Sequence, residues 1–346
     1  MVHLVAAGPA MKLLKRVFFI LMFLLLVLIG VAYLLPREAT AERSIVIDRP
    51  PATVYTVLAG LDRFNEWSPW YGRDPAATYD FSGPAWGSGA SMRWQGNEQV
   101  GEGSYTIVAT EAFERIDVSL DFGPQGIADT WYTLTPVGDG TRVNWGFRTD
   151  LGLNPAGRYF GLLMDRFVGN DYEQGLAKLK TLVEGLPAAD FGPLQASETE
   201  VQPQAIVYVR QRTATDAPAI SAGYAAGYMQ LLPYMAENSL RQAAPPIGIE
   251  IQSGPDEYVF DAAIPVDAQA LQPAEPIQFG HTPAGAVVRV THVGDYAGLT
   301  GSVEALSAFL AARGHRGSGP VWFVFVDDPT QVAADAVRTE IYQRYE

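Results

Sequence analysis

A run of nineteen residues, Val17–Leu35, carries no charged side chain, and it constrains the chain more than any other stretch. It reads VFFILMFLLLVLIGVAYLL. A bilayer core of about 30 Å needs roughly 20 apolar residues in a helix, which satisfies its own backbone groups. A globular protein seldom buries a helix that is apolar on all sides. The sequence therefore predicts a membrane-inserted helix.

Basic residues precede this run and predict its orientation. Lys12, Lys15 and Arg16 stand before it. Positive charge stays in the cytoplasm, so we expect the rest of the chain to be periplasmic or extracellular. A cleaved signal peptide is the alternative, because Ala39–Ala41 fits the small-x-small cleavage rule. The run exceeds the usual apolar region of about 7–15 residues, which favours an uncleaved signal anchor within residues 1–36.

Composition excludes several classes of function. The chain has no cysteine, so it has neither disulfides nor thiolate metal sites. Its net charge of −14 repels phosphate backbones, which argues against nucleic-acid binding. His281, His292 and His315 lack metal-ligand spacing, and we expect a surface or hydrogen-bonded role for each. The sequence predicts no metal site and no cofactor. About 305 residues follow the anchor, which indicates two domains.

Residues 42–187 have the pattern of one α+β domain. Alternating apolar residues predict strands, and a 3.6-residue period predicts helices. Gly138–Gly140 predicts a hairpin turn between the last two strands. The predicted strands are 44–48, 91–95, 104–110, 116–122, 130–136 and 141–149, and the predicted helices are 52–61 and 155–186.

Four segments of this domain resemble the START/polyketide-cyclase-like (SRPBCC) superfamily. They read PPATVYTVLAGLDRFNEWSPW, GSGASMRWQG, VGEGSYTIV and GDGTRVNWGF, in that order. The resemblance implies a helix-grip fold, a curved antiparallel sheet around a long C-terminal helix, with a cavity for hydrophobic ligands. Some members of the superfamily are enzymes. Four tryptophans are candidate cavity residues, with a purely structural role in the core as the alternative: Trp67, Trp70, Trp94 and Trp145.

A linker and an internal repeat come next. Residues 188–203 are rich in Pro, Ala and acids and predict an inter-domain linker. Residues 204–346 contain the order strand, helix, strand, strand twice. Two such units side by side predict one sheet with helices on one face and a groove at the pseudo-twofold axis. The predicted elements are 205–212, 217–241, 247–252 and 258–265, then 286–293, 300–313, 321–326 and 338–345.

This repeat resembles the GyrI-like effector-binding domain, which also forms the drug-sensing half of some AraC- and MerR-type regulators. The matching segments are VGDY (293–296), GPVWFVFVDDP (319–329) and RTEIYQRY (338–345). The resemblance implies a ligand in the groove between the repeats, walled by aromatic residues. Strand alternation places Trp322 on one face and Phe323 and Phe325 on the other. The candidate ligand residues are Tyr208, Tyr228, Phe260, Trp322, Phe323, Phe325, Glu340 and Tyr342, and Tyr258 is a further aromatic candidate for the groove wall.

One position departs from the family pattern. Many members carry Glu immediately after the aromatic that follows the proline, and this Glu meets cationic ligands. The matching residue here is Phe323, and Glu340 or Asp261 are the possible substitutes. Because desolvating a cation without an acidic partner costs several kcal/mol, we expect neutral ligands to be preferred.

These features favour a membrane-tethered, extracytoplasmic binder of small hydrophobic molecules or lipids, working through two cavity modules and without catalysis. The alternatives are an enzyme, cyclase- or hydrolase-like, acting on a hydrophobic or aromatic molecule in one cavity, and a structural protein with filled cavities. An anchored cavity domain replaces the helix-turn-helix region of a regulator, so a transcription factor is not expected.

Overall fold

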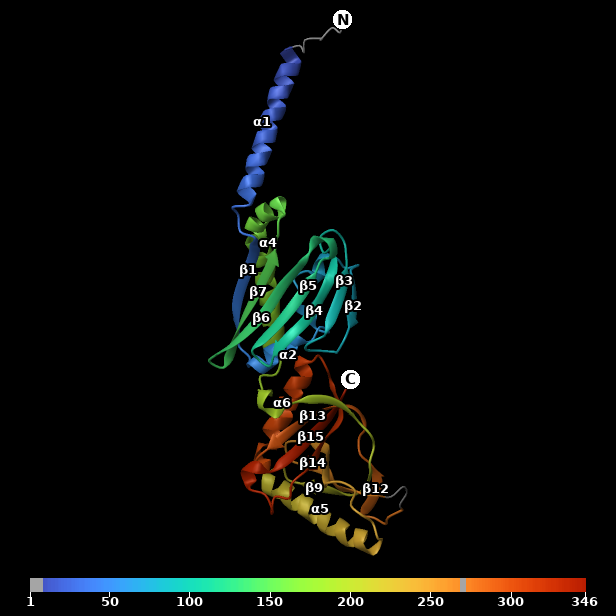
Figure 1. Cartoon of the computed structure of the whole chain (residues 1–346). Helices are drawn as coiled ribbons and strands as arrows, with labels where there is room; N and C mark the ends of the chain where they lie inside the picture. Colours follow the sequence, from blue (N-terminus) through green and yellow to red (C-terminus); the bar gives the residue numbers. More distant parts are fainter. Residues whose placement is uncertain (1–8, 268–271) are drawn as a thin grey trace. The chain divides into compact units, whose positions relative to one another are not determined.

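The computed structural model describes residues 9–267 and 272–346. The chain is α+β, with an N-terminal helix, two antiparallel sheets and a long helix between them in sequence (Figure 1). The predicted fold class is therefore confirmed. The chain divides into two compact units. The first comprises residues up to 47, 59–137 and 142–182, and the second comprises residues 48–58, 138–141 and 183–346.

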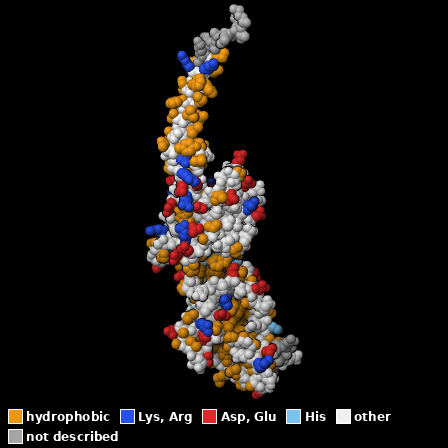
Figure 2. All heavy atoms as spheres, viewed as in Figure 1, with side chains coloured by type: hydrophobic (Ala, Val, Ile, Leu, Met, Phe, Trp, Pro, Cys, Tyr) orange, Lys and Arg blue, Asp and Glu red, His pale blue; other side chains and the backbone are white. Residues whose placement is uncertain are grey.

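Helix α1 (Pro9–Ala32) contains the apolar run. Its segment Leu13–Ala32 has a mean hydropathy of 2.5 and is not buried against the rest of the protein. Figure 2 shows hydrophobic side chains along its length. Among the residues that the structure describes, it is the one helix long and apolar enough to cross a membrane. Its 20 residues span about 30 Å at a rise of about 1.5 Å each.

The first sheet has seven strands in the order β1-β7-β6-β5-β4-β3-β2. Strand β2 was not predicted, because TYDFS is short and mostly exposed at the sheet edge. The strands are β1 (Glu38–Ile47), β2 (Thr78–Ser82), β3 (Ser91–Gln95), β4 (Glu102–Glu111), β5 (Arg115–Asp121), β6 (Ile127–Val137) and β7 (Gly140–Asp150). The helices and 3-10 turns are α2 (Pro51–Ala59), α3 (Phe64–Trp67), η1 (Tyr71–Arg73), η2 (Gly123–Gln125) and α4 (Pro155–Glu184).

Aromatic side chains hold α4 on this sheet. The Trp145 ring of β7 stacks on the Tyr172 ring of α4, with centroids 3.7 Å apart. The Trp145 indole N–H donates to Thr130 Oγ1 at 2.9 Å, so its polar edge is satisfied. Trp67 and Tyr132 pack on Trp145 with centroids 5.5 and 5.2 Å away. Large aromatic rings dominate core energetics, which explains why α4 stays on the sheet.

The second sheet has eight strands in the order β12-β9-β11-β10-β14-β15-β13-β8. Helix α5 packs on β9 and β11, and α6 packs on β13 and β15. The strands are β8 (Ser197–Val201), β9 (Ala205–Thr213), β10 (Ile247–Ser253), β11 (Tyr258–Pro265), β12 (Ile277–His281), β13 (Gly285–Val293), β14 (Gly317–Phe325) and β15 (Arg338–Tyr345). The helices and turns are η3 (Gly192–Leu194), α5 (Ala217–Glu237), η4 (Tyr296–Gly298), α6 (Leu299–Ala312) and η5 (Ala334–Ala336).

The internal repeat is present and is longer than predicted. Strand order is symmetric about the central pair β10 and β14. Each repeat also has an extra first strand that pairs in the other repeat, β8 with β13 and β12 with β9. Strand β8 (SETEV) lies inside the segment predicted as a linker, residues 188–203. The strand was not predicted because its residues are polar and half-exposed. It forms through pairing with a distant strand and not through local strand preference.

Candidate ligand-binding site

Helix α5 contains the short repeat GYAAGY, whose two tyrosines lie against the second sheet. Gly223 and Gly227 are buried, and Tyr224 and Tyr228 directly follow them. A Cβ on Gly227 would lie 2.5 Å from the Ala262 Cβ, so glycine is needed for this close approach. The two tyrosine rings then lie side by side with centroids 6.1 Å apart.

Both repeats contribute rings around Tyr224. Its centroid is 4.0 Å from Phe260 of β11 and 5.2 Å from Phe325 of β14. The ring centroids of Phe325 and Tyr296 of η4 are 5.6 Å apart, and those of Tyr258 and Phe260 are 5.4 Å apart. We call Tyr224, Tyr228, Tyr258, Phe260, Tyr296 and Phe325 the tyrosine cluster.

The central strands leave room for the Tyr224 hydroxyl. Strands β10 and β14 pair at Gly248 and Phe323. A Cβ on Gly248 would lie 2.1 Å from Tyr224 Oη, so the hydroxyl sits on the backbone of β10. It is buried and interacts with the Tyr258 hydroxyl, but without a hydrogen bond of ordinary geometry to the described residues. A buried hydroxyl with no partner costs about 1–3 kcal/mol, so a poorly placed partner leaves part of that cost, which a polar ligand atom would relieve.

A buried histidine fixes the turn that carries Tyr296. His292 Nδ1 lies 2.8 Å from Ser302 Oγ, and Nε2 lies 3.0 Å from the Asp295 carbonyl oxygen. The Asp295 carboxylate accepts from the Ala297 N–H at 2.8 Å at the start of η4. The hydrogen-bonded role expected for His292 is confirmed.

Glu250 of β10 is the acidic residue beside the cluster. It is half-buried and pairs across from Phe260. Burial raises the pKa of Glu250 above its ordinary value, and a hydrogen bond from Tyr258 partly offsets that rise. A partly desolvated carboxylate stabilises a cation or a hydrogen-bond donor placed next to it. The tyrosine cluster therefore has an acid beside it, and neither Glu340 nor Asp261 supplies that acid. The expected preference for neutral ligands stays a prediction.

The phenols of the cluster stay protonated. Burial raises the pKa of Tyr224 well above its ordinary value, and it also raises those of Tyr228 and Tyr258. Burial raises the pKa of Tyr296 too, followed by the nearby charge of Asp328. A protonated phenol offers an O–H donor and an apolar ring face. The cluster thus combines neutral rings, hydroxyl donors and one carboxylate.

The predicted alternation along β14 is confirmed. Trp322 and Val324 belong to an apolar cluster on one face of the sheet, whereas Phe325 contacts Tyr224 of α5 on the other. Phe323 shares the Phe325 face by alternation and is buried. Of the predicted ligand residues, the structure thus brings Tyr228, Phe260 and Phe325 together around Tyr224, and alternation places Phe323 on the same face.

The other predicted residues lie on the opposite face. The Trp322 and Tyr342 rings stack with centroids 5.3 Å apart. The Tyr342 hydroxyl donates to Glu340 Oε2 at 2.5 Å, and the Tyr208 hydroxyl donates to Gln278 Oε1 at 2.8 Å. These hydroxyl groups already make hydrogen bonds within the protein, so this face offers fewer unused polar groups to a ligand than the tyrosine cluster does.

The two acids considered as substitutes are also partnered there. The Arg210 guanidinium donates two hydrogen bonds to Asp261, at 2.8 and 2.9 Å. Arg289 lies 3.6 Å from Glu340. A carboxylate already paired with arginine offers little to a further cation.

The tryptophans of the first domain occupy different places. Trp67 and Trp145 lie in the core, each 1% exposed. Trp70 is half-buried and donates to Asp171 Oδ2 at 2.9 Å, and Trp94 is half-buried and donates to a backbone carbonyl at 3.3 Å. The Trp67 indole N–H is buried without a hydrogen-bond partner among the described residues. A ligand contact for these four residues stays a prediction.

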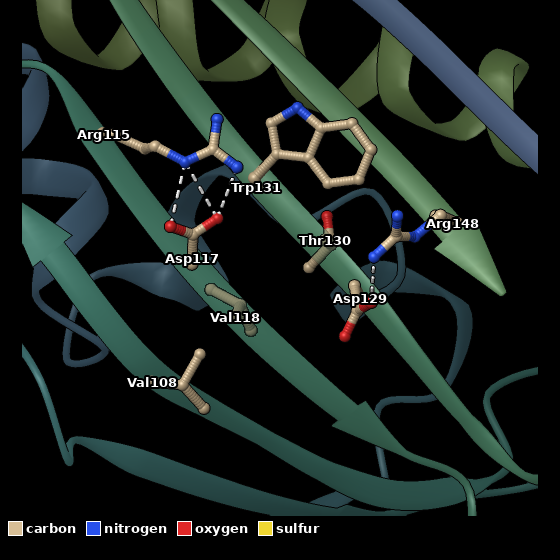
Figure 3. Close-up of a pocket in the computed structure, with 8 residues that line it drawn as sticks. All are labelled: Val108, Arg115, Asp117, Val118, Asp129, Thr130, Trp131 and Arg148. Carbon is tan, nitrogen blue, oxygen red and sulfur yellow. Dashed lines mark hydrogen bonds and ion pairs between the residues drawn. The ribbon is translucent and has the colours of Figure 1, made fainter.

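A hollow of about 470 Å³ lies over strands β4, β5, β6 and β7 (Figure 3). Arg115 pairs with Asp117 at 2.6 Å, and Arg148 pairs with Asp129 at 3.0 Å. The Arg115 guanidinium also lies 5.9 Å from the Trp131 ring centroid. Because its charges neutralise each other in pairs, this hollow is a weaker candidate than the tyrosine cluster.

The sequence-based selection missed Tyr224, Tyr296 and Glu250. The GYAAGY repeat of α5 is a usable signal for Tyr224, because small residues four apart mark the packed side of a helix. Glu250 gives no such signal, since its place beside Tyr258 depends on strand pairing.

Comparisons with known proteins divide the chain in two. Residues 38–184 match the family described as polyketide cyclase / dehydrase and lipid transport. Residues 195–346 match the GyrI-like small molecule binding domain. No curated protein matches the chain.

Solved structures are similar to parts of the chain at low identity. The crystal structure of the EcmrR C-terminal domain is 16% identical, covers 44% of this chain and 98% of that chain, and has a TM-score of 0.37. Protein CV1439 from Chromobacterium violaceum is 19% identical, with coverages of 42% and 97% and a TM-score of 0.31. A hydrolase from Listeria innocua is 13% identical, with coverages of 44% and 91% and a TM-score of 0.34. None of these likenesses is strong enough to indicate function. The family matches show that the chain carries a polyketide-cyclase-type domain followed by a GyrI-like small-molecule-binding domain.

Proposed function

We propose that this protein is a membrane-tethered, extracytoplasmic binder of small hydrophobic molecules, without a catalytic step of its own. The observation that carries the proposal is the tyrosine cluster. Rings from both repeats lie on the α5 face of the central strands, and Glu250 lies partly desolvated beside them. The Tyr224 hydroxyl interacts with Tyr258 but makes no hydrogen bond of ordinary geometry to the described residues. Rings, hydroxyl donors and one acid suit a planar apolar molecule that has a polar or positively charged end.

Energetics favour an apolar ligand of modest size. Apolar burial contributes about 25 cal/mol per Å², so roughly 200 Å² of buried ligand surface gives about 5 kcal/mol. Aromatic faces add about 0.5–2 kcal/mol for a cation, and Glu250 supplies the acidic partner that such a cation needs. Glu250 therefore widens the expected ligand range from neutral molecules to cationic ones.

The tether rests on α1 and on the start of strand β1. Strand β1 begins at Glu38, six residues after α1 ends, and includes the small residues Ala39–Ala41. Ala39 and Ala41 are 4% and 3% exposed within the folded strand. Cleavage after Ala41 would remove the first part of β1 and the Arg37–Asp150 ion pair. These contacts support an uncleaved anchor, and the basic residues before it support an outside location for the domains.

Native mass spectrometry of the full chain in mild detergent tests the binding function. We expect a bound small-molecule mass that is lost in Tyr224→Ala and kept in Tyr342→Ala, which alters the opposite face. Added protease should digest the domains in spheroplasts but not in intact cells. If the wild-type protein carries no bound mass and also binds no added hydrophobic dye, the binding function is contradicted.

A further inference from the structure

The first part of α4 leaves large apolar side chains exposed. Phe160, Leu163 and Phe167 are 53%, 48% and 53% exposed, and Leu153 before the helix is 77% exposed. Phe160 and Phe167 stack with centroids 6.2 Å apart. The spacing i, i+3, i+7 puts the three helical residues on one face. We call Leu153, Phe160, Leu163 and Phe167 the α4 patch. Contiguous apolar patches of this kind mark interaction sites.

Hydrogen bonds join the start of α4 to the end of α1. The Tyr159 hydroxyl donates to the Leu28 carbonyl at 2.8 Å. The Tyr33 hydroxyl donates to the Leu153 carbonyl at 3.3 Å, and Arg158 Nη1 donates to the Tyr33 carbonyl at 3.3 Å. The Arg158 guanidinium also lies 5.3 Å from the Tyr33 ring centroid. The patch is thus attached to the apolar helix at a defined height.

That height is given by the position of Leu28. It lies four residues before the end of the apolar segment Leu13–Ala32, which is about 6 Å along a helix. Interfacial helices bury their apolar face about 5–10 Å into the boundary between headgroups and acyl chains. Tyr159 therefore reaches the depth of this boundary, and Phe160 is the next residue.

We propose that the α4 patch is a second membrane contact, which enters the lipid leaflet at the C-terminal end of α1. The inference rests on the proposed function, because it needs α1 in the membrane. Tyr33 and Arg158 fit the interface, where aromatic residues anchor and long basic side chains extend to the headgroups. Continuity with the apolar surface of α1 identifies a lipid bilayer as the occupant rather than a second copy of the chain.

Charge near the patch is mixed. Arg158 donates to backbone carbonyls, and Arg166 is exposed next to Phe167, whereas two other arginines are in ion pairs. Arg37 pairs with Asp150 at 2.5 Å, and Arg43 pairs with Asp165 at 2.9 Å. The contact is therefore made by the apolar side chains, and the positive charges of Arg158 and Arg166 lie beside them. With two contacts, the first domain is held against the bilayer in one orientation instead of swinging from a single anchor.

Depth-dependent quenching in the full-length chain tests this contact. The chain has no cysteine, so single substitutions give unique labelling sites. A bimane label is placed at Leu153→Cys, Phe160→Cys and Phe167→Cys in phosphatidylcholine vesicles containing spin-labelled lipid. Leu25→Cys in α1 reports insertion of the anchor. Val108→Cys is the matched surface control, since Val108 is 53% exposed, like Phe160.

We expect shallow-position spin labels to quench Leu153→Cys and Phe160→Cys at least about twofold more than Val108→Cys, with Phe167→Cys between them. Quenching at Leu25→Cys but not at Phe160→Cys would overturn the second contact and leave the tether intact. Loss of quenching at both positions would overturn the tether and this inference together. Fluorescence transfer between differently labelled Phe160→Cys chains, without lipid quenching, would show that a second copy occupies the patch.

Discussion

Replacing Glu250 by Gln should selectively weaken the binding of cationic ligands. The substitution keeps the size of the side chain and removes its negative charge. Burial raises the pKa of Glu250, which means that the folded protein without ligand disfavours the ionised carboxylate relative to water. A bound cation would reverse this, because it favours the ionised form. The carboxylate thus contributes most to binding when a positive charge lies beside it.

The size of the effect depends on the kind of contact. A hydrogen bond to a charged group contributes about 1.5–3 kcal/mol. At about 1.4 kcal/mol per factor of ten, the affinity for a cation falls about 10- to 100-fold in Glu250→Gln. A neutral ligand of the same shape keeps its ring contacts with Tyr224 and Phe325, so its affinity should change less than about twofold.

Fluorescence titration of the full chain with a matched quaternary ammonium and neutral dye measures both affinities. Glu340→Gln is the control, because Glu340 lies on the opposite face and is already bonded to Tyr342. We expect it to leave both affinities unchanged. A larger loss of cation binding in Glu340→Gln than in Glu250→Gln would refute the assignment of the site to the tyrosine cluster.

Three further predictions concern stability. Trp145→Ala should lower the free energy of unfolding by about 3–5 kcal/mol in urea titrations, whereas Trp131→Ala on the outer face should cost less than half of that. A fragment of residues 195–346 should melt cooperatively at a higher temperature than 204–346, because the shorter fragment lacks β8 and its pairing with β13; equal melting temperatures would show that β8 adds nothing. The pKa of Glu250 is higher in the folded protein than in the unfolded chain, so the unfolded chain loses the proton first as the pH rises from below 4.5. The free energy of unfolding of the wild type should therefore fall relative to that of Glu250→Gln over this range. A difference in unfolding free energy that stays constant with pH would contradict burial of the carboxyl.

The fold was largely predictable because its signals are local. Alternating apolar residues gave the bounds of β3, β11 and β15 as the structure has them. Strands β2, β8 and β12 were missed for one shared reason. Each is short, lies at a sheet edge and has mixed polarity, so only pairing with a distant strand defines it.

The site was less predictable because it depends on pairing between distant strands. Resemblance directed attention to Phe323 and the aromatic residues around it. It did not show that Tyr224 rests on Gly248, or that Glu250 lies beside Tyr258. These relations need the register of β10 against β11 and the closeness of α5, neither of which a sequence pattern reports.

The pseudo-twofold symmetry explains why a ligand here should take one orientation. The central pair is Gly248 and Phe323, and Glu250 and Phe325 each lie two residues further along their own strand. The two are therefore equivalent positions in the repeats, about 13 Å apart at about 3.3 Å per strand residue. An exact repeat would place the same side chain at both ends. The repeats carry a carboxylate at one end and an aromatic ring at the other, so we expect a bound molecule of two or three rings to place its polar or positive end toward Glu250.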